Sequence, residues 1–310
     1  PVTTYASNYT FALVPSMNLH FTEAGWQTRS SSWTNLNPTV ETVFGTGATA
    51  LSYLSETEWL PQTEFLYGTA YWVNSPDFSF YSSTAPVSTG EVNYSLQQGW
   101  NFIPNPHLCS YPLSSIRFTV NGQLFRFSEM ISQKLISRGV FVYRNGSYMA
   151  VNEILPNESF FIKYYGGASL TTYINFLPFY EAPEITPPTS NWQLAIDVSS
   201  VNSDKDSFVL GTNPTANEGY DFRLDLPAAP VKPFTSLQTY ISREAPEDVS
   251  FLDGKLYCEF RSPFNATLEQ EKIWNFKLVA PSADPINFTL TGLTLPAGYT
   301  FRIGIDGMQH

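Results

Sequence analysis

Short runs that alternate between polar residues and aromatic or β-branched residues recur along almost the whole chain. Alternation with a period of two puts every second side chain on one face of an extended strand, whereas a helix needs a period near 3.6. Turn signals separate the runs. Asn121-Gly122 and Asn145-Gly146 suit tight hairpins because both residue types tolerate positive φ. The chain is therefore predicted to be all-β, with strands expected at 9–14, 69–73, 78–81, 91–96, 116–120, 139–143, 159–164, 192–198, 207–210, 237–241, 256–260, 273–278, 286–290 and 299–303.

The 310 residues are enough for two β-sandwich-like modules. Residues 1–180 are predicted to form an aromatic-rich β-module. Residues 181–190 are predicted to be a linker, because their prolines cannot donate to a sheet and favour an extended chain. Residues 191–310 contain strand-like runs at the spacing typical of an antiparallel β-sandwich.

Two further patterns refine the first module. One short helix is expected at Ser128–Ser137, where a serine cap precedes apolar residues on one face and Gly139 follows as a stop signal. Gly68–Val73 and Asn157–Ile162 each place two aromatic residues before a β-branched residue, and each follows a Leu-Pro pair. Duplicated halves would explain this echo, and chance is the alternative.

The charge composition excludes several classes of partner. Charged residues make up only 14% of the chain, and the net charge of −11 leaves 16 scattered Lys and Arg. Binding to nucleic acid or to an anionic membrane needs a cluster of basic side chains, so neither is expected. No apolar run reaches the roughly 20 residues of a membrane helix, so membrane insertion is not expected either. Low charge with many Tyr, Thr, Ser and Asn favours an extracellular or cell-surface location.

Catalytic chemistry finds little support in the sequence. His20, His107 and His310 are the only histidines, no Gly-x-Ser-x-Gly elbow is present, and no catalytic residue is assigned. His107 is expected in a surface loop. A glycosidase needs only two suitably spaced carboxylates, so that activity stays open as a distant alternative.

Loop carboxylates raise the question of a metal. No cofactor is expected, and calcium is the alternative because its ligands are hard oxygens. The carboxylates that would bind it are Asp204, Asp206, Asp221 and Asp225. Ordinary turns, in which Asp accepts from nearby backbone N–H groups, explain the same residues equally well.

The remaining candidate residues are tryptophans for binding sugars, cysteines for a disulfide, and asparagines for glycosylation. Trp26, Trp33 and Trp59 lie in polar surroundings and could stack on a sugar ring, although core packing is the competing interpretation. Cys109 and Cys258 could form a disulfide between the modules or remain buried thiols. Glycosylation sequons begin at Asn8, Asn93, Asn145, Asn157, Asn265 and Asn287.

A longer motif carries a resemblance. Gly99-Trp-Asn-Phe-Ile-Pro-Asn-Pro106, together with the Tyr71-Trp-Val73 strand, resembles a segment of modular secreted bacterial surface proteins, many exported by the type IX route. The residues after 191 are similar to a β-sandwich near the C-termini of those proteins. The matching residues there are Trp192-Gln-Leu, Gly211, Glu218-Gly-Tyr-Asp221, Asp225-Leu-Pro227, Trp274-Asn-Phe and Leu295-Pro-Ala-Gly298. The resemblance implies a surface location and a β-architecture more than an activity.

One departure from that pattern suggests assembly. Another strand or two would be expected after Asp306-Gly307, so the second module could lack a terminal strand. An N-terminal segment carrying Tyr5, Tyr9, Phe11 and Leu13 is a candidate donor strand, which between subunits would make a fibre. Pairing of this segment within its own module is the alternative.

These observations together predict a non-catalytic, extracellular structural or adhesive surface protein that could polymerise by strand addition. Its expected partners are other copies of itself or other surface proteins, and glycans are a further option. The rival prediction is a pair of carbohydrate-binding modules from a secreted polysaccharide-degrading protein.

Overall fold

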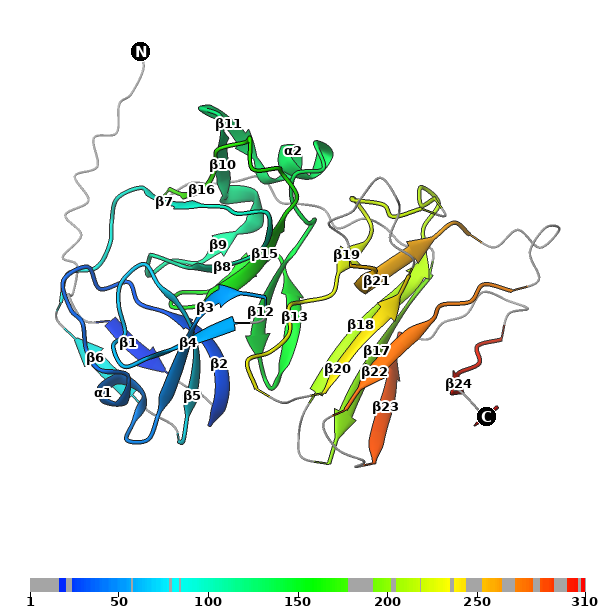
Figure 1. The fold of residues 1–310 in the computed structure, drawn as a ribbon, viewed down its shortest axis with the longest axis horizontal. Helices are drawn as coiled ribbons and strands as arrows, with labels where there is room; N and C mark the ends of the chain where they lie inside the picture. Colours follow the sequence, from blue (N-terminus) through cyan, green and yellow to red (C-terminus); the bar gives the residue numbers. More distant parts are fainter. Residues whose placement is uncertain are drawn as a thin grey trace, which may run out of the picture.

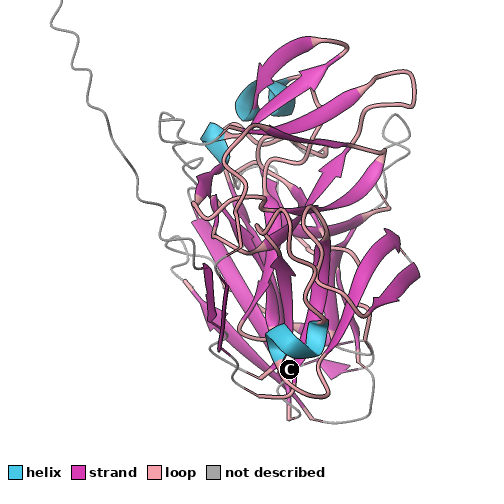
Figure 2. Ribbon diagram, turned by 90° about the vertical axis from the view of Figure 1, so that its left-hand side faces the viewer, coloured by secondary structure: helices cyan, strands magenta, loops and turns pink. Residues whose placement is uncertain are grey.

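The structure is a computed structural model, and Figures 1 and 2 show an all-β architecture, as the sequence predicts. The predicted linker at 181–190 and the candidate donor-strand residues Tyr5, Tyr9, Phe11 and Leu13 lie outside the residues that it describes. The described residues are 17–20, 24–56, 58–77, 80–83, 85–177, 192–201, 205–217, 219–234, 237–243, 253–263, 271–280, 285–292, 300–305 and 308–309.

Three four-stranded sheets build the first module, and they are called sheets 1, 2 and 3 here. Sheet 1 has the order β2 (Gly25–Ser30), β5 (Ala70–Ser75), β3 (Thr49–Ser55), β4 (Glu58–Gln62). Sheet 2 has the order β8 (Gly99–Pro104), β15 (Ser159–Tyr164), β12 (Val140–Arg144), β13 (Ser147–Val151). Sheet 3 has the order β7 (Val92–Ser95), β16 (Thr172–Phe176), β10 (Arg117–Val120), β11 (Gln123–Arg126). Two short ribbons complete the module: β1 (Met17–His20) with β6 (Phe80–Ser83), and β9 (Tyr111–Pro112) with β14 (Glu153–Ile154).

Sheets 1 and 2 share their connectivity and register. In each, a strand that starts with Gly-Trp pairs with a central strand, which pairs with the first strand of a hairpin. Trp72 in the centre of sheet 1 pairs with Thr28 and Leu51, and Phe161 in sheet 2 pairs with its counterparts Phe102 and Phe141. This match supports the predicted duplication. The second Gly-Trp pair, Gly25-Trp26, is a sequence signal for the duplication that the predicted echo omitted.

The central strand of sheet 2, β15, is buried on both faces, and its sequence Ser-Phe-Phe-Ile-Lys-Tyr has no solvent-facing residue. Ile103, Val142 and Phe160 pack on one side against sheet 3. Phe141 and Phe161 pack on the other side, together with Trp72 of sheet 1. Strands covered on both faces lose the clean alternation of a half-exposed sheet.

The helices differ from the sequence prediction. The helix expected at Ser128–Ser137 is shorter: α2 spans Phe127–Ser132 and ends because Lys134 adopts a positive φ of 58°. A second helix, α1 (Val40–Phe44), was not predicted. Its signal was present, since Thr39 Oγ1 accepts from Thr42 N at 3.2 Å and Gly45 follows as the C-cap. A 3₁₀ turn spans Leu113–Ser115.

The second module consists mainly of one curled sheet. Its edges come together around the core, because the rings of Phe276 and Phe288, on opposite edge strands, lie 6.2 Å apart. An antiparallel module was predicted, but the neighbouring strands β18 and β21 are parallel. Strands β19 and β20 lie between them in the sequence, so no hairpin joins β18 to β21. The sheet order is β22 (Phe276–Val279), β20 (Gln238–Ser242), β21 (Lys255–Arg261), β18 (Lys205–Thr212), β17 (Trp192–Ser200), β23 (Ile286–Thr291), and β19 (Leu226–Pro227) also pairs with β21. A separate two-stranded ribbon is formed by β24 (Gly304–Ile305) and β25 (Met308–Gln309).

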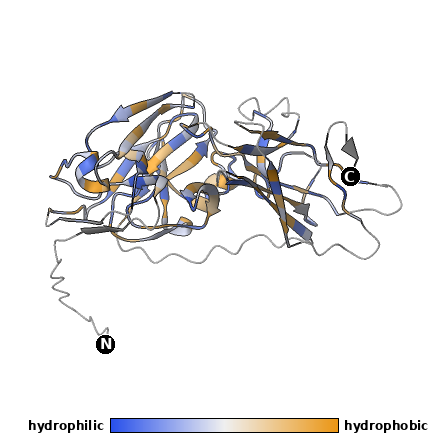
Figure 3. Ribbon diagram, turned by 90° about the horizontal axis from the view of Figure 1, so that it is seen from below, coloured by the Kyte–Doolittle hydropathy of each residue, from blue (hydrophilic) through white to orange (hydrophobic). Residues whose placement is uncertain are grey.

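The two modules lie side by side (Figure 3) and are joined by a buried aromatic layer, called the intermodule cluster here. Phe234 of the second module stacks on Trp26 of the first at 4.9 Å and 10°. The side chain of Lys163 approaches Asp253 to 3.9 Å, and Arg138 Nη2 donates to Cys258 Sγ at 3.3 Å. The cluster includes Trp72, Trp100, Phe141, Tyr143, Tyr148, Phe161, Ala216, Leu224, Leu226, Cys258 and Phe260.

Close backbone packing explains one glycine of the sequence motif. A Cβ on Gly211 would lie 2.4 Å from Trp192 O and 2.8 Å from the Phe260 ring. The contact with Trp192 involves main chain, which cannot move away without disturbing the β17–β18 pairing. Gly211 is therefore required by the fold rather than by a ligand.

Candidate ligand groove

An open groove lies between sheets 1 and 2 on the first module and is called the ligand groove here. Its volume is about 710 Å³. The floor carries buried residues of β8, including Trp100 and Asn101, and the rim carries exposed Glu56, Gln97 and Gln98. The groove is therefore open to solvent and rich in hydrogen-bonding groups.

The Gly-Trp-Asn-Phe-Ile-Pro-Asn-Pro motif forms the floor, and its polar residues hold turns. Asn101 Oδ1 accepts from Gln97 N at 2.8 Å, and its Nδ2 donates to Gln97 O at 2.7 Å. Asn105 is fully buried, and its Nδ2 donates to Cys109 O and to Leu155 O, both at 2.9 Å. Both asparagines bond to backbone, and only Asn101, which holds the turn from Gln97, lines the groove.

Charged and phenolic groups give the groove its electrostatics. Behind the groove lining, the Nζ atom of the buried Lys163 lies 5.4 Å from the Trp100 ring centroid, and burial lowers the pKa of this lysine while Asp253 and Glu56 oppose that shift. Burial, and then Glu56, raises the pKa of Tyr53, so this phenol stays neutral and can donate. The arrangement can bind a polar ligand through amides, a carboxylate and a phenol.

The three tryptophans predicted to stack on sugars do not share a surface. Trp33 is fully buried and packs edge-on against Phe65 and Tyr81, so the core interpretation holds for it. Trp26 is half-buried and covered by Phe234. Trp59 is also half-buried, and it contacts rings of both sheets. The groove lining instead brings Tyr53 and Trp100 together with Gln97 and Gln98, a polar pair that directly precedes Gly99 in the sequence.

The three predicted calcium ligands that the structure describes, Asp206, Asp221 and Asp225, do not converge. Asp206 lies in β18, where its Oδ2 accepts from Thr239 N at 2.6 Å, and Asp204 lies outside the described residues. Asp225 Oδ2 accepts from Asp221 N, and Asp225 Oδ1 accepts from Phe260 N, both at 2.8 Å. Asp221 Oδ1 accepts from Arg223 N at 2.8 Å. Over the ranges that the structure describes, no group of three or more His, Cys, Asp or Glu could hold a metal.

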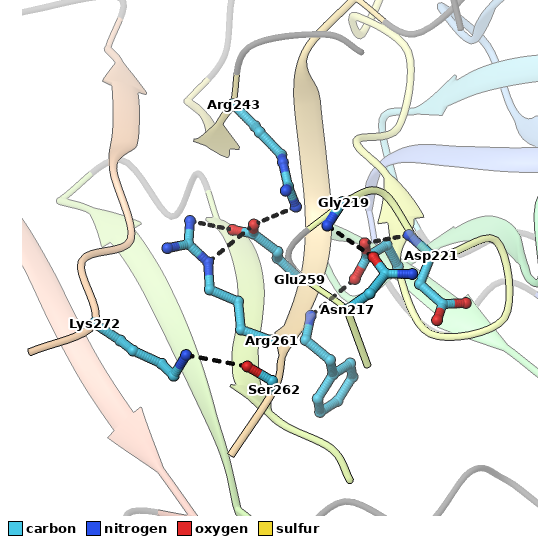
Figure 4. Close-up of polar contacts among 10 residues, drawn as sticks. Asn217, Gly219, Asp221, Arg243, Glu259, Arg261, Ser262 and Lys272 are labelled. Atoms are coloured by element: carbon cyan, nitrogen blue, oxygen red, sulfur yellow. Dashed lines mark hydrogen bonds and ion pairs between the residues drawn. The ribbon is translucent and has the colours of Figure 1, made fainter. Parts of the chain in front are cut away.

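Figure 4 shows a second polar cluster beside these turns. The fully buried Glu259 accepts from Arg243 Nη1 at 2.8 Å and from Arg261 Nε at 3.2 Å. Arg261 also lies over the Trp274 ring at 5.1 Å. Two guanidinium groups thus compensate the charge of one buried carboxylate, so this cluster has a structural role.

The stability of an Asp225→Asn variant, measured relative to the wild type, is expected to rise with pH. Burial is the main reason that the pKa of Asp225 is raised to about 7 from 3.8. The folded state therefore binds more protons than the unfolded state between these values, so ionisation of Asp225 costs stability as pH rises from 4 to 8. Asparagine stays neutral, so the relative gain approaches about 4 kcal/mol at 1.36 kcal/mol per pKa unit. Urea unfolding of both proteins at pH 4, 5.5, 7 and 8.5 measures it, and a constant difference would contradict this assignment.

The cysteines and sequons have defined environments. Cys109 is half-buried, Cys258 is buried, and both are free thiols, so no disulfide joins the modules. Asn93, Asn145 and Asn287 are exposed, whereas Asn157 is 9% exposed and its Oδ1 accepts from Ser32 Oγ. Burial of Asn157 makes it a poor glycan acceptor, and Asn8 and Asn265 lie outside the described residues.

The expectation that His107 lies on the surface is wrong. It is 2% exposed, its Nδ1 is 2.6 Å from Tyr111 Oη, and its Nε2 is 2.8 Å from Gly90 O. Burial lowers the pKa of His107. The hydrogen bonds of His107 hold the loop after β8 in place. The position of His107 in the sequence did not predict this burial.

In the described parts of the chain, neither helix has the length and apolar character needed to cross a lipid bilayer. No protein-family model matches this sequence, and no curated protein and no solved structure matches it either.

Proposed function

We propose that the chain is a non-catalytic extracellular structural or adhesive protein. The observation that carries this proposal is the intermodule cluster, which joins two β-modules through buried rings. A continuous buried contact resists relative motion of the modules better than a flexible linker would, which suits a protein that bears load at a surface.

Assembly by strand addition is the second element of the proposal. Strand β23 has the sequence Ile-Asn-Phe-Thr-Leu-Thr, which is uncharged, free of proline and largely exposed. Within the described residues it pairs only with β17, and no described strand bonds to its other edge. An exposed uncharged edge is a template for a strand of another copy.

Lysines on this edge are expected to block assembly. Asn287 and Thr289 are exposed on β23, and charge at both positions repels a second strand without entering the core. Electron microscopy and sedimentation of the wild type should show polymers, and the N287K/T289K variant should remain monomeric with an unchanged circular dichroism spectrum. The S128K/Q133K variant, which adds the same charge at exposed positions of α2 and its C-cap, is the control and should still assemble.

Two outcomes would overturn the proposed function. Monomeric wild-type protein at high concentration would remove the polymer. Binding of a soluble polysaccharide without assembly, lost in a Q97A/Q98A variant, would favour the carbohydrate-binding alternative, which the polar ligand groove supports.

A further inference from the structure

Strand β8 runs along the ligand groove, and one of its edges bonds to no other strand among the described residues. Its other edge pairs with β15 from Gly99 to Pro104. All of residues 100–104 line the groove, although neighbouring residues of a strand point their side chains to opposite faces. A groove that both sets of residues line follows the edge of β8 rather than one of its faces.

Two hydrogen bonds outside the strand ladder show which backbone groups of β8 face away from β15. Asn105 N donates to Glu158 O at 2.9 Å, and these residues continue the register of β8 and β15, so every second pair before them exchanges backbone hydrogen bonds. Ser137 N donates to Lys163 O at 2.9 Å, so this carbonyl points away from β8 and from Trp100, the residue opposite Lys163. The pairs in between, which include Trp100 with Lys163, are therefore not hydrogen-bonded to each other.

The backbone groups of Trp100 and Phe102 consequently point toward the unpaired edge. No described residue bonds to these amides and carbonyls on that side. Phe102 is only half-buried, and both residues line the groove. Their two amides and two carbonyls repeat about 7 Å apart, and an extended peptide presents matching groups at the same repeat. An oligosaccharide does not reproduce this repeat.

The duplicated half of the module shows that the opening is specific to β8. Strand β2 occupies the equivalent place in sheet 1, and it bonds to sheet 2 and to the segment before β15. Ser30 N donates to Asn157 O at 3.0 Å, and Thr28 Oγ1 accepts from Tyr143 N at 3.3 Å. The counterpart of Ser30 in β8 is Pro104, which has no N–H. The same strand edge is thus closed in one half and left to the groove in the other.

The charge of the groove limits what can bind along this edge. Among the described residues that line it, Glu56 is the only charged one, and it is exposed. A Cβ on Gly99 would lie 3.4 Å from Glu56 Oε1, so the carboxylate stands at the start of β8. It repels an acidic segment and attracts a basic side chain at that end.

We propose that the ligand groove binds an extended, neutral or basic peptide segment of another protein, which adds as a strand to the edge of β8. Pairing along residues 100–104 takes about five peptide residues, and about 710 Å³ lies within the roughly 300–1,000 Å³ of ligand sites. Backbone hydrogen bonds supply affinity in this mode of recognition. The inference does not depend on assembly through β23, which belongs to the other module.

Three capped seven-residue peptides of alternating threonine and valine are the probes. One has lysine at both ends, one has glutamate at both ends, and the third is the lysine peptide with methyl groups on all backbone nitrogens. Isothermal titration of the whole chain should show that the lysine peptide binds about three- to ten-fold more tightly than the glutamate peptide. The methylated peptide should not bind, because methylation removes the N–H donors without changing the charge.

Two controls separate this site from the alternatives. The N287K/T289K variant should bind the lysine peptide as the wild type does, so the result is independent of polymer formation. Maltohexaose tests the carbohydrate alternative, and binding of maltohexaose without binding of the lysine peptide would overturn the proposal.

Hydrogen exchange measured by NMR locates the bound peptide. The Phe102 amide should exchange at least about ten-fold more slowly with saturating lysine peptide, because it gains a hydrogen-bond partner. The Ile103 amide belongs to a pair that is bonded to β15, so it is the internal control and should not change. Unchanged exchange at Phe102 would contradict strand addition at this edge.

Glu56→Lys tests the charge at the start of β8. This variant should bind the lysine peptide about three- to ten-fold more weakly and the glutamate peptide more tightly. Glu271→Lys makes the same change at an exposed position of the second module and should alter neither affinity by more than about two-fold. Both side chains are exposed, so both variants should fold normally. Equal effects of the two variants, or no binding of the lysine peptide to the wild type, would overturn the proposal.

Discussion

Replacing Trp72 by alanine is expected to lower the free energy of unfolding by about 3–5 kcal/mol, the range for removing a buried aromatic ring. Trp72 is fully buried, and its ring contacts those of Trp59, Tyr143, Phe161 and Phe234 at centroid distances of 4.7–6.4 Å. A cavity here would remove contacts on both modules at once. Urea unfolding followed by tryptophan fluorescence and circular dichroism measures the loss.

Trp33→Ala separates this effect from a general loss of core packing. Trp33 is also fully buried, but its cluster consists of residues between Trp33 and Val87 of the first module. Both variants should lose stability, but only Trp72→Ala should speed hydrogen exchange at the Ala228 amide, which donates to Lys255 O beside the interface. Equal exchange in the two variants would show that Trp72 does not hold the modules together.

Replacing Glu158 by glutamine is the second change with a large expected effect, about 3–5 kcal/mol of destabilisation. Glu158 is 3% exposed, and its carboxylate accepts from Arg144 Nε at 2.6 Å and from Arg144 Nη2 at 2.7 Å. Leu155 N also donates to it at 3.0 Å. The amide would remove the carboxylate that pairs directly with the Arg144 guanidinium.

A second guanidinium also depends on Glu158. Burial lowers the pKa of Arg29 to about 10, and the charge of Glu158 partly offsets that shift. Glu153→Gln is the matched control, because Glu153 is exposed on β14 and makes the same change of charge near Arg144. Guanidinium unfolding should show less than about 0.5 kcal/mol for this control, the usual range for surface changes. A comparable loss in both variants would mean that the ion pair adds little.

Only local sequence patterns were available for predicting the candidate site. The motif from Gly99 to Pro106 forms β8 and the start of the turn after it, and its asparagines bond to backbone rather than to a ligand. Of the candidate tryptophans, Trp33 is in the core and Trp26 is covered by a residue more than 200 positions away, Phe234. Sequence spacing carries no information about such a distant partner.

The sequence by itself determined that this chain forms strands, because period-two alternation and Asn-Gly turns act within a few residues. It also showed a similar pattern in Gly68–Val73 and Asn157–Ile162, which overlap β5 and β15, the strands that occupy equivalent places in sheets 1 and 2. Only the tertiary structure decided that β18 and β21 run parallel and that Asp225 and His107 are buried. The physical reason is that burial and desolvation depend on which distant surfaces meet, and long-range packing sets that choice.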